Sequence, residues 1–521
     1  MANDNLKQRA FSGVLWDYAN HFGTLLIGIV PSMILARLLT PSEYGLIAMA
    51  GIFNALAFAL SDGGFNSALL QRKDATHLDK CSIFYTNIGI NTFFYLVFFF
   101  LAPYCAEFFN EPRITLIIRI SLLSMPLVAI GGVHSIILKK EMNFKAPAIR
   151  NFVVQSLAAI IAIILAYCGC GVWSLVVQGV FQTLGNSIVN CILCSWRPTL
   201  QFSFASVKSM FSYGIKIYIY NLTGYAFSKA IDTTIAKTYT PADLSYYNRA
   251  YSTANLFINS VLGAINNVAF PTFANMQGDK NRLKAGLSKM VSVTFMVTVL
   301  MMSLLFVMSE PLFNFMYSSK WNAVIPLFQI VCVWGISQSL QKIFELFLGA
   351  TGCAGIIMYM CFVSNGMSLA MAFLAWYFSI PVLLVGQICI DILKLLIYSY
   401  FTHRFYKYNI FSVVKDSYIF LLPTFCTALI AFGVDHISVE ILSPLISSEF
   451  ILSAIRIFLS LSIAISFYIV INRIMNLPTY RDLVTLSLNV VGAKNQRVSE
   501  LIRKIVLRES TFSLKSNHGK S

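Results

Sequence analysis

The sequence contains few charged residues and few of the polar segments that are typical of soluble domains. Only 12% of its 521 residues are Asp, Glu, Lys or Arg, while 57% are hydrophobic. Soluble domains carry roughly twice that charged fraction, so a soluble globular fold is excluded. Apolar runs long enough to cross a ~30 Å hydrocarbon core recur along the chain. Backbone groups at that depth need internal partners, which predicts an all-α integral membrane protein.

Catalytic signatures are missing as well. The chain has no Walker loop, no HExxH and no G-x-S-x-G motif, and its loops are too short to hold a soluble active site. We therefore expect a protein that is not an enzyme and has no metal or organic cofactor. The cysteine pairs Cys168-x-Cys170 and Cys191-x-x-Cys194 lack the histidines or the second pair that a zinc site needs. We interpret these cysteines as packing residues.

The apolar runs predict about fourteen membrane-spanning helices joined by short loops. The predicted spans are 12–36, 44–66, 82–105, 114–138, 147–168, 171–194, 210–236, 244–270, 286–308, 323–349, 355–378, 381–402, 417–434 and 451–472. We divide the chain accordingly into an N-terminal lobe (1–200), a C-terminal lobe (201–403), two further spans (404–475) and a basic amphipathic tail (476–521). The tail is expected to lie on the inner leaflet or to pack beneath the bundle.

Positive charge outweighs negative charge, with 38 Lys and Arg against 22 Asp and Glu. Most of the basic residues gather in alternate loops, which we place in the cytoplasm together with both termini. The basic residues assigned to the opposite side are Arg37, Arg113, Lys237, Lys320 and Arg456. We attribute the basic charge to topology and to contact with anionic membrane lipids, and we expect no nucleic-acid partner.

One sequence pattern occurs twice, 200 residues apart. The stretch ARLLTPSE at 36–43 corresponds to AKTYTPAD at 236–243. Six predicted spans separate the two copies, so both point the same way through the membrane. A parallel repeat of this kind predicts two pseudo-symmetric lobes with a site between them.

The segment 211–277 forms two apolar arms that carry charge, joined by a turn at Thr240. Charged groups at membrane depth are costly and favour a water-filled cavity or each other. At a rise of 1.5 Å per residue, positions 232 and 249 lie at one depth, roughly 13 Å from the turn. Asp232 can then pair with Arg249, which leaves Lys229 for an anionic ligand such as phosphate. The alternative is a structural ion pair that locks the hairpin. The candidate substrate-binding residues are Lys216, Asn221, Lys229, Asp232, Arg249 and Asn255.

Other polar residues within the spans are candidates for coupling or gating. Asp17 and His21 share a helical face at i,i+4 spacing, which fits a proton-sensitive gate or polar packing between helices. Lys342 and Glu345 are an i,i+3 pair that can neutralise itself and line a lobe. The similar pair 391/394 is interpreted as structural.

Several stretches are similar to a known family. They are 39–50, 62–73, 246–251, Phe270-Pro271, Lys320-Trp321 and 325–327. They resemble the lipopolysaccharide-exporter (colanic-acid-exporter-like) branch of the polysaccharide transporters, in the multidrug/oligosaccharidyl-lipid/polysaccharide exporter superfamily. The resemblance extends over roughly residues 1–475.

This resemblance implies a two-lobed, MATE-like alternating-access fold in the bacterial inner membrane. It implies a flippase for a polyprenyl-pyrophosphate-linked oligosaccharide, a cationic central cavity, and H⁺ or Na⁺ coupling. Partners would be membrane lipids and the polysaccharide polymerase and chain-length proteins. Of the candidate residues, only Arg249 lies in a matching motif. The alternatives are a cation-coupled small-molecule exporter of the same fold, a membrane-embedded polymerase or acyltransferase, and a scaffold without transport.

Overall fold

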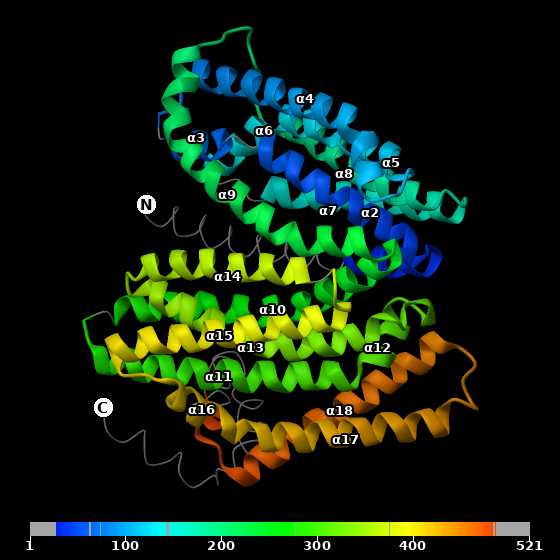
Figure 1. Ribbon diagram of the computed structural model, residues 1–521, viewed down its shortest axis with the longest axis vertical. Helices are drawn as coiled ribbons and strands as arrows, with labels where there is room; N and C mark the ends of the chain where they lie inside the picture. Colours follow the sequence, from blue (N-terminus) through cyan, green and yellow to red (C-terminus); the bar gives the residue numbers. More distant parts are fainter. Residues whose placement is uncertain are drawn as a thin grey trace. The chain divides into compact units, whose positions relative to one another are not determined.

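The computed structural model describes residues 28–61, 64–72, 74–141, 145–276, 278–374, 376–482 and 485. Throughout these ranges the chain is helical, with turns and short loops between the helices (Figure 1). Helices satisfy their backbone hydrogen bonds internally, as a membrane-spanning segment requires. The prediction of an all-α protein is confirmed for this part of the chain.

Most of the helices are long for a globular protein. Their bounds are α2 Pro41–Ser61, α3 Phe65–Gln71, α4 His77–Phe108, α5 Ile114–Ser121, α6 Ser124–Lys140, α7 Lys145–Tyr167, α8 Val172–Leu193, α9 Phe204–Thr238, α10 Pro241–Asn275, α11 Lys280–Val307, α12 Ser309–Met316, η1 Ser319–Trp321, α13 Val324–Ala350, α14 Ala354–Leu374, α15 Ile380–Tyr406, α16 Ile410–Ser417, η2 Tyr418–Phe420, α17 Leu421–Leu442 and α18 Glu449–Met475.

Within the described residues, 11 helical stretches are long and apolar enough to cross a membrane. Each coincides with a predicted span. The predicted spans 210–236 and 244–270 correspond to α9 and α10, in which charged and amide side chains lower the hydropathy. Most of the predicted span 12–36 lies outside the described residues. The total of fourteen spans therefore stays a prediction.

The chain forms two compact units. Unit 1 comprises Met1–Asn248 with Ser368–Tyr377, and unit 2 comprises Arg249–Met367 with Phe378–Ser521. The predicted lobe boundaries at 200, 403 and 475 stay predictions.

In unit 1, α8 packs along α7 and α6, and α6 packs along α4. The following helix, α9, packs on α2, α3 and α4. Apolar side chains of α3, α4 and α6 form the core where these helices meet, including Phe65, Leu69, Ile83 and Val133. Burial of these apolar side chains provides the main driving force for their association.

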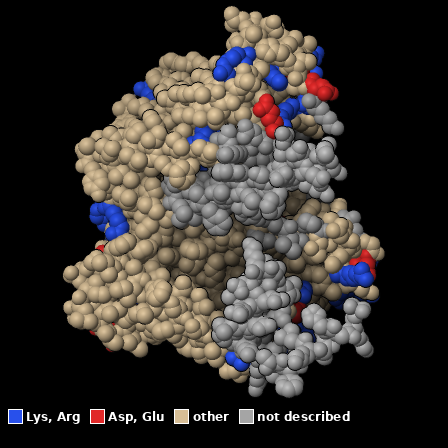
Figure 2. Space-filling view, turned by 180° about the vertical axis from the view of Figure 1, so that it is seen from behind, with Lys and Arg blue, Asp and Glu red and all other residues tan. Residues whose placement is uncertain are grey.

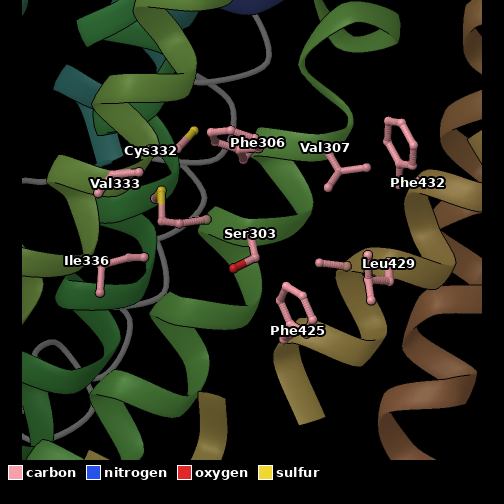
Figure 3. Close-up of a pocket in the computed structure, with 11 residues that line it drawn as sticks. Ser303, Phe306, Val307, Cys332, Val333, Ile336, Phe425, Leu429 and Phe432 are labelled. Atoms are coloured by element: carbon pink, nitrogen blue, oxygen red, sulfur yellow. The ribbon is translucent and has the colours of Figure 1, made fainter. Parts of the chain in front are cut away.

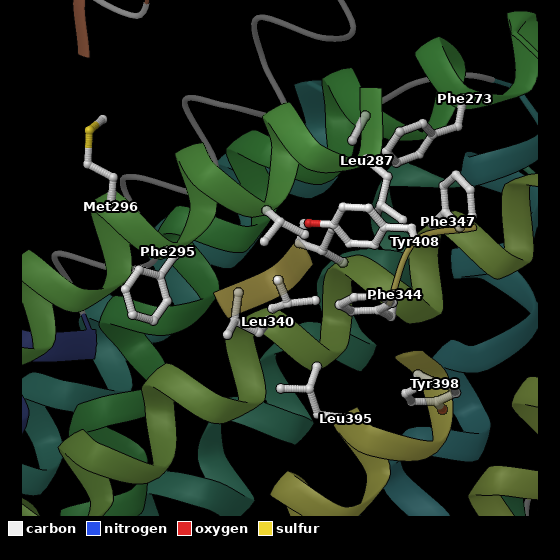
Figure 4. Packing of buried hydrophobic residues seen from close by; sticks show 14 of the residues in the cluster. Phe273, Leu287, Phe295, Met296, Leu340, Phe344, Phe347, Leu395, Tyr398 and Tyr408 are labelled. Carbon is white, nitrogen blue, oxygen red and sulfur yellow. The ribbon is translucent and has the colours of Figure 1, made fainter. Parts of the chain in front are cut away.

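In unit 2, α13 lies between α11 and α15, and α17 pairs with α18 (Figure 1). The core of this unit is built around aromatic rings, shown in Figure 4. Phe344 and Phe347 are fully buried, and Phe273 meets Phe347 edge to face at 5.1 Å between ring centroids. Edge-to-face contact matches the positive ring edge to the negative ring face.

Both copies of the repeated sequence start a helix. Proline occupies the first helical position of α2 and of α10, where its missing N–H costs nothing. In the first copy the backbone N–H of Thr40 donates to Glu43 at 2.7 Å, and in the second that of Thr240 donates to Asp243 at 3.1 Å. In each copy the threonine hydroxyl oxygen also accepts the N–H of the acidic residue. The repeat is thus a duplicated capping box.

The two helix starts meet within unit 1. A Cβ atom at Gly45 would lie 1.8 Å from the carbonyl oxygen of Pro241, so only glycine fits here. The contact is backbone against backbone, and neither side can move away by a change of rotamer.

One of the basic residues assigned to the opposite side of the membrane is buried. Arg456 lies in α18 and is only 4% exposed. Its guanidinium donates two parallel hydrogen bonds to Asp435 of α17, at 2.9 and 2.8 Å. Glu310 of α12 lies 3.6 Å from the same guanidinium. Acidic partners on two neighbouring helices explain why this charge can be buried.

Charge is sparse on the surface. On the face shown in Figure 2, Lys, Arg, Asp and Glu form small scattered groups among uncharged residues. Large apolar side chains such as Phe100, Phe411 and Phe458 are more than two-thirds exposed. Exposed apolar side chains of this size fit contact with acyl chains.

Candidate substrate-binding site

Arg249 is a candidate residue that packs against two aromatic rings. Its guanidinium carbon lies 4.6 Å from the ring centroid of Tyr317 and 5.1 Å from that of Trp321. Trp321 is fully buried and Tyr317 is 4% exposed, while Arg249 itself is half-buried. The negative ring faces attract the cation most strongly where water is excluded.

The local backbone brings the two rings to this place. Tyr317 directly follows α12, and Trp321 ends the short helix η1, three residues after a turn at Ser318 with φ 88°. The Tyr317 hydroxyl lies 3.4 Å from the hydroxyl of Thr253, one turn beyond Arg249 on α10. The Tyr317 ring therefore contacts the same helix that carries the arginine.

Lys229 is not free, so that part of the prediction was wrong. Its ammonium lies 2.7 Å from Asp232, three residues further along α9. The Asp232 side chain is 10% exposed and that of Lys229 is 39% exposed. Asp232 thus neutralises Lys229 within one helix. An i,i+3 pair needs no neighbouring helix to form, which explains why this local pair forms.

The other candidates from this segment are dispersed. The side chains of Lys216 and Asn221 lie outside the described residues. Asn255 is half-buried on α10. Its separation from Arg249 turns the helix by about 600°, so the two side chains leave α10 on different faces.

The coupling candidates have mixed outcomes. Asp17 and His21 lie outside the described residues. Lys342 and Glu345 form the expected pair at 2.8 Å on α13. Glu345 also accepts from Gln341 at 3.0 Å and lies 3.4 Å from the hydroxyl of Tyr398 on α15. Three donors on one carboxylate make this pair part of a network that ties α13 to α15.

The second i,i+3 pair is also present. Lys394 lies 3.5 Å from Asp391 on α15, and both side chains are largely covered. Among the described residues, no three His, Cys, Asp or Glu side chains gather into a group that could hold a metal ion.

Unit 2 also contains an apolar pocket of about 300 Å³ (Figure 3). Phe425, Leu429 and Phe432 of α17 line one side. Phe306 of α11 and Cys332 of α13 line others. A pocket with these walls can take hydrocarbon but offers little to a polar group.

Two arginines have partners on neighbouring helices that the sequence did not predict. Arg150 lies half-buried on α7 and donates to Asn190 of α8. Arg456 was counted outside and is buried against Asp435. Both positions lie inside predicted apolar spans or at their edges. An arginine in such a position is costly unless it has a partner, so its place in the sequence is a signal that a partner exists.

Comparison with known proteins identifies the family. The polysaccharide biosynthesis protein family matches residues 34–326, more than half of the chain. The chain belongs to this family. The resemblance in the sequence analysis, with the transport proteins of polysaccharide biosynthesis, is confirmed.

Curated relatives carry names from several polysaccharide systems. The lipopolysaccharide biosynthesis protein WzxC of Escherichia coli (strain K12) is 25% identical over 342 residues, 64% of this chain and 69% of WzxC. The succinoglycan biosynthesis transport protein ExoT of Rhizobium meliloti (strain 1021) is 26% identical over 318 residues, 61% of this chain and 64% of ExoT. The teichuronic acid biosynthesis protein TuaB of Bacillus subtilis (strain 168) is 22% identical over 460 residues, 84% of this chain and 92% of TuaB.

Solved structures establish the fold. The lipid II flippase MurJ, in an inward closed conformation, matches with a TM-score of 0.68 and 12% identity, over 89% of this chain and 100% of MurJ. An inward-facing MATE family multidrug transporter matches with a TM-score of 0.56 and 13% identity, over 72% of this chain and 93% of that one. The predicted MATE-like membrane fold is therefore confirmed.

Proposed function

We propose that this protein is a flippase for a polyprenyl-pyrophosphate-linked oligosaccharide in the bacterial inner membrane, serving surface polysaccharide biosynthesis. It belongs to a family of polysaccharide biosynthesis proteins, and its fold is that of a lipid II flippase. In this proposal it moves its cargo between leaflets and performs no covalent chemistry. The N- and C-termini are cytoplasmic.

The observation that carries the proposal is Arg249, a half-buried cation held on two buried aromatic rings. A diphosphate cannot enter hydrocarbon without a large desolvation cost. A guanidinium fixed at membrane depth offers such a group a charge-assisted partner in exchange for water. A binder of cationic drugs would favour carboxylates at this place instead.

The apolar pocket of unit 2 suits the other end of the cargo. A polyprenyl tail needs a hydrocarbon surface, and Phe306, Phe425 and Phe432 supply one. In this proposal the tail contacts this pocket or the surrounding lipid, while the head group contacts the cationic residues.

Energy for directed movement is proposed to come from a proton or sodium gradient. The candidate coupling residues are Asp17, His21, Lys342 and Glu345. The polysaccharide polymerase and chain-length proteins are the proposed protein partners, since they act on the same intermediate after it has changed leaflets.

The test is movement of a polyprenyl-pyrophosphate-linked oligosaccharide between leaflets in proteoliposomes, with and without an imposed proton or sodium gradient. Arg249→Ala should lower the rate by about tenfold or more, because a charge-assisted partner contributes about 1.5–3 kcal/mol. Arg249→Lys should retain part of the activity, since it keeps the charge but not the planar group.

Arg119 provides a matched control. Its guanidinium carbon lies 4.5 Å from the ring centroid of Phe99, and its Nε donates to the Phe99 carbonyl at 3.1 Å. Arg119→Ala should leave the rate near that of the wild type, because this arginine lies outside the motif that carries Arg249. If the Arg249→Ala protein moves the lipid at the wild-type rate, Arg249 is not part of the binding site. A wild-type protein that moves no such lipid would overturn the proposed function.

A further inference from the structure

Helix α8 carries a regular row of amide side chains. Gln178, Gln182, Asn186 and Asn190 follow one another at four-residue spacing in a helix that is otherwise apolar enough to span a membrane. At 1.5 Å per residue the row is about 18 Å long, more than half of a ~30 Å hydrocarbon core. Residues at this spacing form a continuous, slightly inclined ridge on the helix surface.

This amide row faces away from the lipid side of α8. Leu184, Ile188 and Ile192 form an exposed apolar ridge, with exposures of 37%, 50% and 68%. Each lies two residues after a member of the amide row, which places it about 200° round the helix. The amides therefore lie on the opposite side of α8 from the side chains that suit acyl chains.

Most of these amides lack hydrogen-bond partners within the described part of the protein. In the part of the chain that the structure describes, Gln178 and Gln182 make no hydrogen bond, and the buried Oδ1 of Asn186 has no partner. An interhelical packing role would pair these groups across the helix contact. Amides left unpaired at membrane depth are costly, so they need water or a ligand.

A cation lies at one end of the row. Arg150 of α7 donates to the Oδ1 atoms of Asn190 and Asn151, the latter from Nη2 at 2.7 Å. Among the described residues it forms no ion pair with a carboxylate. Asn190 donates in turn to the carbonyl of Gly131 at 3.4 Å. The arginine is thus oriented by neutral oxygens, and its charge is not neutralised there.

We propose that the α8 amide row is a saccharide-binding track, with Arg150 at its end as the partner of an anionic group of the same ligand. An amide offers both donors and an acceptor, as a sugar hydroxyl does, so a row of amides can exchange hydrogen bonds with successive hydroxyls. Lysine or aspartate would hold one charged group instead. The inference rests on the proposed function, because a lipid-linked oligosaccharide supplies both the hydroxyls and the anionic diphosphate.

The test compares two lipids in proteoliposomes: a polyprenyl pyrophosphate that carries a tetrasaccharide, and the same lipid pyrophosphate without sugar. The variant is Gln178→Leu with Gln182→Leu, which keeps side-chain size and removes only amides that bond nothing within the described chain. We expect the tetrasaccharide lipid to move about tenfold more slowly or worse, as the loss of two hydrogen bonds implies, and the sugar-free lipid to move at the wild-type rate. Arg150→Gln should slow both lipids.

Gln329→Leu on α13 is the matched control. Its amide donates to Ser309 at 3.1 Å, so its loss should change stability without changing the ratio of the two rates. Wild-type movement of the tetrasaccharide lipid by the double variant overturns the track, and so does an equal loss for both lipids.

If the wild-type protein moves neither lipid, the proposed function fails and a second measurement decides the track. Saturable binding of the free tetrasaccharide to the purified full-length protein, lost in the double variant, supports the track on its own. Binding that is absent or unchanged overturns it.

Discussion

Two of the ion pairs formed by helix residues differ in how much of each pair is covered. Arg456 and Asp435 join α18 to α17 through two hydrogen bonds, and their side chains are 5% and 12% exposed. Lys229 and Asp232 lie on α9 alone, and the lysine is 39% exposed. The first pair connects two helices and leaves little for a ligand. In the second pair, the Lys229 ammonium stays accessible to a ligand while Asp232 balances its charge.

Breaking the covered pair should have the largest effect. Arg456→Ala leaves Asp435 buried without its bidentate partner, and we expect the free energy of unfolding to fall by about 3–5 kcal/mol. Unfolding of the purified protein in mixed micelles measures this loss. Arg456→Met combined with Asp435→Leu should restore most of the stability and keep lipid movement near wild type, because the pair holds helices together. A double variant that is stable yet inactive would assign the pair a role in transport.

Removal of both charges at the partly exposed pair should instead impair transport. Lys229→Met with Asp232→Asn removes both charges together, so we expect the free energy of unfolding to stay within about 1 kcal/mol of wild type. Movement of the lipid-linked oligosaccharide should nevertheless fall by about tenfold, since a cation near the path is lost. Undiminished transport by this variant would make Lys229–Asp232 a structural pair like the first.

The smallest effect is expected at an ion pair outside the spans. In the loop between α4 and α5, Arg113 Nε lies 2.7 Å from Glu111. The hydrogen bond from Arg113 lowers the pKa of Glu111. The pair therefore stabilises the fold above the carboxyl's unfolded pKa of about 4.3, and this contribution is lost as the pH falls through the lower folded pKa.

Unfolding measured between pH 6 and pH 3 checks this expectation. Glu111→Gln should be less stable than wild type at pH 6, and the difference should vanish at the acidic end. Glu107→Gln is the control, since this neighbouring carboxylate makes no ion pair within the described residues. A difference that persists to pH 3 would mean that Glu111 contributes by packing and not by charge.

The sequence was sufficient for the features that depend on local chemistry. Long apolar runs predicted the 11 spans that the structure bears out, and the turn predicted at Thr240 separates α9 from α10. The spacing of Lys342 and Glu345 predicted their pairing. Each of these depends only on residues that are close in the chain.

The site depended on contacts that sequence spacing does not encode. Arg249 is held by Tyr317 and Trp321, which follow it by more than sixty residues and reach it only through the packing of α10, α12 and η1. For Asp232, equal depth across the turn predicted a partner on the other arm, although Lys229 lies at the i,i+3 position of the same helix. The structure shows that the shorter-range pair forms.

The contact between Gly45 and the Pro241 carbonyl joins the first turn of α2 to the first residue of α10, so the two copies of the duplicated helix start touch each other. A methyl group at position 45 would act there as a wedge. Replacement by alanine, valine and leucine would increase the distance between the two helix starts step by step. Gly51 lies on the same helix with open space around it, so the same replacements there serve as the control. The size of the side chain at position 45 thus sets how closely the starts of α2 and α10 can approach each other.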